Sequence, residues 1–135
     1  MKIVVAYDNR DEGRAALEWA IEEAKRHDAE IIVVGSLRGT GGSDAVVKQV
    51  LPYRRELDEV ERRLTAAGIR HEIKRYVRGR SFAEDVMEDA SDREADMIVI
   101  GLRPRSRAGN LFLRSRSRAI LLGAECPVLA VKVKD

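Results

Sequence analysis

Short apolar runs alternate along this chain with amphipathic helical patterns, and this alternation restricts the fold more than any other feature. A run without polar interruptions is typical of a strand that is buried on both faces of a parallel sheet. The runs are Lys2–Tyr7, Ala29–Gly35, a looser Ile69–Val77, Asp96–Gly101 and Cys126–Val133. We therefore expect an α/β fold of three layers, in which an open, parallel, five-stranded sheet carries helices on both faces.

Four helices are expected between these strands. The first should bury one apolar face, made of Ala16, Leu17, Ala20, Ile21 and Ala24. The second contains Pro52, which predicts a break or kink over residues 50–53, and it should stop at Gly68. A capping box over Ser81–Glu84 opens the third helix, and the fourth is expected over residues 115–122.

Length and composition limit what the chain can do. Its 135 residues fit one domain, residues 1–135, with 44% hydrophobic and 36% charged residues. Lys+Arg is 25 and Asp+Glu is 23, so the net charge of +2 does not favour binding to a polyanion. Aromatic residues are only 4%, which leaves little for stacking on bases. Binding to nucleic acid is therefore not expected.

The few reactive side chains do not assemble into a catalytic or metal-binding pattern. One cysteine, Cys126, and two histidines cannot build a disulfide framework or a cysteine-based zinc site. No Ser-His-Asp or Cys-His set is indicated, so we expect no catalytic residues and no metal site. We see no targeting signal and no apolar run of the roughly 20 residues that a membrane span needs. A reducing cytoplasm is the expected location, with no membrane partner.

Four segments together resemble the universal stress protein family over nearly the whole chain. They are Ile3–Asp8, Arg14–Ala20, Ala95–Gly101 and Cys126–Val131. The resemblance implies a sheet of order 3-2-1-4-5, like that of the adenine nucleotide alpha hydrolases. It also implies a homodimer that pairs through the last strand, Cys126–Val133, and a small, non-catalytic domain of the stress response.

Many members of this family bind ATP through the pattern Gly-x2-Gly-x9-Gly followed by Ser or Thr. Glycines let the backbone approach the phosphates, and backbone N–H groups there donate to the anion. On this chain the pattern falls on Gly101, Pro104, Arg114 and Ser115. Proline removes a backbone donor, and arginine places a bulky side chain where the family has bare backbone. The ATP site is therefore expected to be altered.

Other family positions can be carried over one at a time. Asp8 matches the aspartate that contacts the nucleotide, although capping the first helix is an equally common role. Gly35 and Ser36 occupy the loop whose backbone contacts adenine, and Gly79 follows the third strand. Ser117, with Ser115, could bond phosphate oxygens or cap the last helix.

An arginine-rich stretch keeps a second hypothesis open. Residues 102–123 hold six arginines and no acidic residue. In one interpretation Arg103, Arg105 or Arg114 holds the phosphates of ATP, of another nucleotide or of RNA, or a smaller anion, in place of the glycines, with Mg²⁺ present only if ATP binds. Weak ATPase activity would fit that interpretation. In the other, these arginines are solvated or paired with acids on the first and third helices.

Overall fold

Helices and strands alternate along the chain as expected. The computed structural model describes residues 1–8, 10–37, 43–77, 81–103 and 115–133. Its elements are β1 (Lys2–Tyr7), α1 (Asp11–His27), β2 (Glu30–Leu37), α2 (Ser43–Ala66), β3 (His71–Val77), α3 (Phe82–Asp92), β4 (Met97–Leu102), α4 (Ser115–Gly123) and β5 (Val128–Lys132). The five strands form one parallel sheet of order β3-β2-β1-β4-β5, which confirms the expected fold class and strand order.

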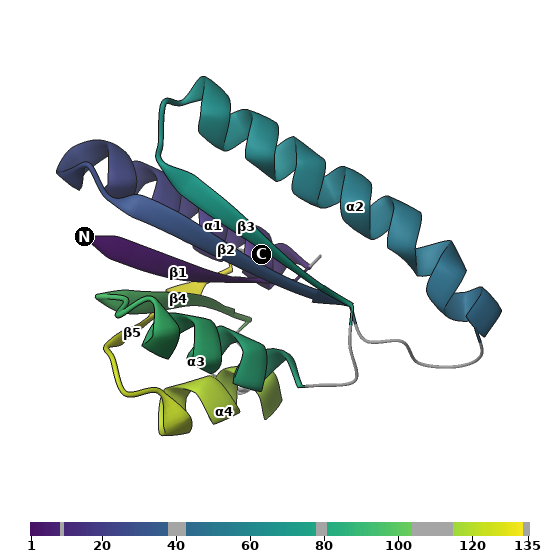
Figure 1. The fold of residues 1–135 in the computed structure, drawn as a ribbon. Helices are drawn as coiled ribbons and strands as arrows, with labels where there is room; N and C mark the ends of the chain where they lie inside the picture. The colour runs from purple at the N-terminus through teal and green to yellow at the C-terminus, as the bar shows by residue number, and fades with distance from the viewer. Residues whose placement is uncertain (9, 38–42, 78–80, 104–114, 134–135) are drawn as a thin grey trace.

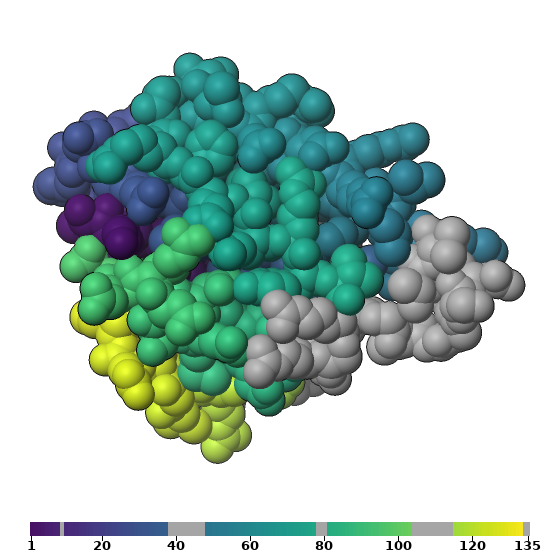
Figure 2. Space-filling view, viewed as in Figure 1, coloured from purple at the N-terminus to yellow at the C-terminus, as the bar shows by residue number. Residues whose placement is uncertain are grey.

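The sheet separates two apolar cores. Helices α1 and α2 cover one face, where Leu17 and Leu57 pack against alternate residues of the strands. Helices α3 and α4 cover the other face through Val86 and Ile120. Strand β1 lies in the middle of the sheet (Figure 1) and is buried along all but its first residue, and little purple shows on the face of the molecule in Figure 2. Successive residues of β1 are apolar because they point alternately into the two cores.

Helix α2 runs through Pro52 without interruption, so the predicted break over residues 50–53 is wrong. A proline in a helix interior removes one backbone hydrogen bond. Packing offsets that loss, because Leu57 and Leu64 are completely or almost completely buried against the sheet. The expected stop at Gly68 is confirmed, since this glycine adopts a φ of 70° beyond the helix end.

Local signals place the other helix ends. The side chain of Ser81 accepts a hydrogen bond from the backbone N–H of Glu84 at 3.1 Å, as the capping box predicts. Helix α1 begins with Asp11 and Glu12 and ends with basic residues, which suits the helix dipole. Within the described ranges, no helix has the length and apolar character that crossing a membrane requires.

Candidate functional site

Parallel strands direct the site to one edge of the sheet. Ligands of such sheets bind beyond the carboxyl ends of the strands, at the point where the strand order reverses. Here that point lies between β1 and β4, which are paired neighbours. Asp8 follows β1, and Gly101 lies near the end of β4. We call the group made by Asp8, Glu12, Gly101, Arg103 and Ser117 the carboxyl-edge site.

Asp8 is engaged in the turn from β1 into α1. Its Oδ1 accepts hydrogen bonds from the backbone N–H groups of Gly13 at 3.1 Å and Arg10 at 3.2 Å. Arg10, the N-cap of α1, makes no side-chain cap of its own, so Asp8 supplies an acceptor at this helix start. The capping role that the sequence left open for Asp8 is therefore the one seen here.

Two glycines bring α1 close to the strands. A Cβ on Gly101 would lie 2.0 Å from the backbone oxygen of Glu12, and one on Gly13 would lie 2.3 Å from the backbone oxygen of Asp8. No side chain fits at either distance. Tight packing of helix against strand thus requires Gly101, whether or not a phosphate binds there. Gly13 was missed by the sequence reasoning, although a glycine in the first turn of a helix signals a close approach.

Arg103 is held by two acids of the first turn of α1. Its Nε donates to Glu12 Oε1 at 3.0 Å, and its Nη2 donates to Asp11 Oδ2 at 2.8 Å. Glu12 is buried, with 6% of its surface exposed. The hydrogen bond to Glu12 raises the pKa of the Arg103 guanidinium, and burial opposes this. Pairing with acids on the first helix is the alternative that the sequence left open, and Arg103 follows it.

The ion pairs continue from α1 to α2. Arg14 bridges Asp11 at 3.3 Å and Glu56 at 3.2 Å. Tyr7, at the end of β1, donates its hydroxyl to Glu56 Oε1 at 2.6 Å. Burial first, and then this hydrogen bond, raise the pKa of Tyr7 above its ordinary value. One connected network therefore reaches from Arg103 to the middle of α2.

The other predicted positions on β2 face different neighbours. Gly35 packs against Leu57 of α2. The Ser36 hydroxyl lies 3.3 Å from Oδ2 of Asp85, a residue of α3 that is 2% exposed. Within the described part of the chain, Oδ1 of Asp85 has no hydrogen-bond partner. Ser36 is thus tied to a buried carboxyl group that the sequence reasoning did not single out.

Two small hollows adjoin Asp8. One, of about 20 Å³, is bordered by Gly101 and Ser117, and the guanidinium of Arg116 lies over the ring of Phe82 there, 5.7 Å from its centre. The other, of about 30 Å³, is bordered by Ser36. Ligand pockets commonly measure about 300–1,000 Å³. Asp8, Ser36, Gly101, Arg103 and Ser117 therefore gather at one edge, but their described surroundings enclose little space.

Several predicted positions stand apart from this cluster or outside the described ranges. Ser115 is the first residue of α4 and is exposed. Gly79, Pro104, Arg105 and Arg114 lie outside the described residues. In the part of the chain that the structure describes, no group of three or more His, Cys, Asp or Glu side chains could hold a metal ion.

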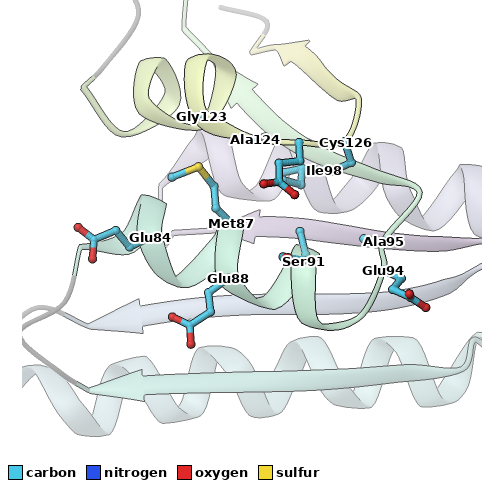
Figure 3. A pocket seen from close by; sticks show the side chains of 12 residues that line it. Glu84, Met87, Glu88, Ser91, Glu94, Ala95, Ile98, Gly123, Ala124 and Cys126 are labelled. Atoms are coloured by element: carbon cyan, nitrogen blue, oxygen red, sulfur yellow. The ribbon is translucent and has the colours of Figure 1, made fainter.

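A larger hollow lies away from the carboxyl-edge site. It measures about 600 Å³ and is bordered by α3 and by the turn from α4 into β5 (Figure 3). Met87 points from α3 toward Gly123 at the end of α4. Because no ligand motif in the sequence falls on this surface, sequence reasoning gave no reason to consider it.

Comparison with known proteins agrees with this fold and strand order. The model of the Universal stress protein family matches residues 1–132. A universal stress protein of Mycolicibacterium smegmatis is 38% identical over 130 residues, which is 96% of each chain. A universal stress protein structure from Archaeoglobus fulgidus is 29% identical with a TM-score of 0.77, covering 97% of both chains. A structure of the universal stress protein from A. fulgidus in complex with dAMP is 26% identical with a TM-score of 0.68, covering 97% of this chain and 96% of that one. This chain therefore belongs to the universal stress protein family.

Proposed function

We propose that this chain is a homodimeric regulatory domain that acts by binding rather than by catalysis, and that its family ATP site is altered. The pairing of Arg103 with Asp11 and Glu12 carries the proposal. An arginine at the end of β4 is well placed to meet a phosphate, but two carboxylates already hold this one. A phosphate would have to compete with both of them, and it would be repelled by their negative charge.

Two further observations support the altered site. Pro104 and Arg114 stand where the family pattern has glycines. The described hollows beside Asp8 are about 20 and 30 Å³, far smaller than a nucleotide pocket. Gly101 and Asp8, which match the family, each have a structural role that needs no nucleotide.

Titration calorimetry tests this proposal directly. Purified protein is titrated with ATP plus Mg²⁺, with AMP and with inorganic phosphate. We expect ATP to bind more weakly than about 1 mM, a free energy of about −4 kcal/mol. Micromolar binding of ATP would overturn the proposal, and so would ATP that stays with the protein through purification.

A second candidate function is nucleotide binding through the arginines. The dAMP complex of the A. fulgidus relative favours it, because that relative is similar over nearly the whole chain. Ser117, Ser115, Arg105 and Arg114 would then contact phosphate, with Mg²⁺ arriving alongside ATP and weak ATPase activity at most. In that case Arg105→Gln with Arg114→Gln should weaken nucleotide binding at least about tenfold. Arg55→Gln, an exposed arginine on α2, is the control.

The homodimer is proposed to form through β5. This strand is at one edge of the sheet, and its apolar residues are only partly covered. The carbonyl oxygen of Pro127 accepts a hydrogen bond from β4, and the backbone N–H of Val133 donates one to β4. Because the backbone groups of successive residues point alternately to the two sides of a strand, the N–H and C=O groups of Ala130 point toward the open edge. Ala130→Pro should therefore reduce the dimer to a monomer, while Ala130→Ser should not. Light scattering after gel filtration measures this, and a dimeric Ala130→Pro variant would contradict pairing through β5.

A further inference from the structure

The 600 Å³ hollow combines an apolar floor with an acidic rim. We call it the acidic groove (Figure 3). Its floor includes Met87, Ala90, Ile98, Ala124 and Cys126. Its rim carries four glutamates, namely Glu84, Glu88, Glu94 and Glu125. Floor and rim come from α3, the turn after it, the start of β4 and the turn between α4 and β5.

Three of the four rim glutamates differ from the carboxyl-edge acids in their ion pairs. Among the described residues that line the groove, none is Lys or Arg. No ion pair within the described ranges involves Glu84, Glu94 or Glu125. Like charges around one concave surface reinforce each other's potential. The groove therefore favours an occupant that combines apolar side chains with positive charge.

One segment of this chain has that combination. Residues 104–114 contain Arg105, Arg107 and Arg114, no acidic residue, and the apolar triplet 111–113. The triplet would suit the floor, and the flanking arginines would suit the rim. We propose that the acidic groove binds residues 104–114 of a second copy of the chain.

A second copy is favoured over the same copy by where the segment is anchored. It leaves from Leu102 at the end of β4 and returns at Ser115, the start of α4. The groove reaches Ala95 and Ile98, at the opposite end of β4, and Cys126 just before β5. Groove and segment are different surfaces, so the contact is head to tail. Together with pairing through β5, it would join dimers into larger assemblies.

Cys126 provides a readout that is specific to the groove. It is the only cysteine of the chain, and it borders the groove. Its alkylation by iodoacetamide can be followed by mass spectrometry, at about pH 8.5 because burial raises the pKa of the thiol. The probe is a synthetic peptide of residues 104–114 with blocked ends. We expect saturating peptide to slow alkylation severalfold, and an unchanged rate would overturn the proposal.

Matched variants separate charge and apolar contacts. Glu84→Gln with Glu125→Gln should weaken peptide binding about tenfold, since each substitution removes one ion pair between the rim and an arginine of the peptide. Glu22→Gln with Glu59→Gln removes two exposed acids on α1 and α2, across the sheet, and should leave binding unchanged. A peptide with Leu111, Phe112 and Leu113 replaced by serine should not protect Cys126. If the two double variants lost the same amount of peptide affinity, the peptide would be attracted only by the overall charge of the protein. That result would overturn the proposal that the peptide binds in the groove.

The full-length protein tests whether the contact forms between copies. Alkylation of Cys126 should slow as protein concentration rises. The triple variant Arg105→Gln, Arg107→Gln and Arg114→Gln retains β5 and should lose this concentration dependence. Protection of Cys126 that does not depend on protein concentration would mean that a chain fills its own groove, and this result would overturn the proposal. A concentration dependence that persists in the triple variant would also overturn it.

Discussion

The carboxyl-edge site and the acidic groove are both rich in carboxylates, but they differ in what surrounds those charges. At the carboxyl edge, Glu12 is buried against Arg103 and the backbone of α1 touches Gly101. In the groove, glutamates stand around a hollow of about 600 Å³. Two sites of similar composition can thus differ in what matters for binding. At one, the carboxylates are already paired and the space is filled, whereas the other leaves room for a ligand.

The largest expected effect is a stability difference between two glycine substitutions. Gly101→Ala would put a Cβ 2.0 Å from backbone that cannot move independently, so we expect it to lower the free energy of unfolding by about 3 kcal/mol or more. Gly123→Ala would meet the flexible side chain of Met87 at 2.9 Å. Its effect should stay below about 1 kcal/mol, since alanine also favours a helix. Urea denaturation measures both, and similar losses would remove the contrast in packing.

A smaller difference is expected when one carboxylate is neutralised in each region. Glu12→Gln weakens a pair whose acid is buried but whose arginine is 37% exposed, so we expect a loss of about 1 kcal/mol. Glu125→Gln, on the groove rim, should change stability by less than about 0.5 kcal/mol. Thermal unfolding of the two variants beside the parent protein gives the comparison. A loss for Glu125→Gln as large as that for Glu12→Gln would show that Glu125 already has a stabilising partner within its own folded chain.

Freeing Arg103 should make the carboxyl edge a better anion site. Asp11→Asn with Glu12→Gln removes both competing carboxylates. We expect affinity for inorganic phosphate to rise about fivefold, because exposed ion pairs are worth up to about 1 kcal/mol. Phosphate-dependent chemical shifts measure the affinity, with the Glu22→Gln and Glu59→Gln pair as control. No gain would mean that Arg103 does not reach a bound anion even when it is free.

The smallest effect concerns Asp89, which lies on the same helix as Glu84 and Glu88 of the groove but is buried. Tyr76 donates its hydroxyl to Oδ1 at 2.9 Å and Oδ2 at 2.8 Å. Burial raises the pKa of Asp89 above its ordinary value of 3.8, and these hydrogen bonds oppose the rise. The folded protein therefore holds the Asp89 proton more tightly than the unfolded chain does. Its contribution to stability is complete below pH 3.8 and is lost as pH rises through the folded pKa.

Two variants check this sign. Asp89→Asn should remove that part of the pH dependence and keep an acceptor for Tyr76. Tyr76→Phe should extend the pH dependence of stability to higher pH, because the hydrogen bonds that stabilise the Asp89 carboxylate, and so lower its pKa, are gone. Unfolding curves at a series of acid pH values decide the matter. A slope that is the same in all three proteins would mean that Asp89 titrates as it does in the unfolded chain.

The sequence was sufficient for the fold but not for the state of the site. Five apolar runs and the family resemblance predicted the strands and their order, because burial on both faces leaves a local signal that can be read residue by residue. Pro52 misled the prediction, since packing of the later turns of α2 outweighs one lost hydrogen bond. The pairing of Arg103 with Glu12 joins residues 91 positions apart, and no local pattern encodes it. Both outcomes for Arg103 therefore remained open until the structure placed α1 beside β4.

The central position of β1 has a consequence for how the chain is made. It precedes the other four strands in the sequence, yet it pairs on one side with β2, which begins at Glu30, and on the other with β4, which begins at Met97. One edge of this strand, which is apolar from Ile3 to Ala6, therefore stays unpaired until β4 has been made. Exposed strand edges are templates for association with other chains. Products that terminate before β4 should aggregate, and we expect a growing chain to depend on early packing of α1, or on a chaperone, until the fourth strand arrives.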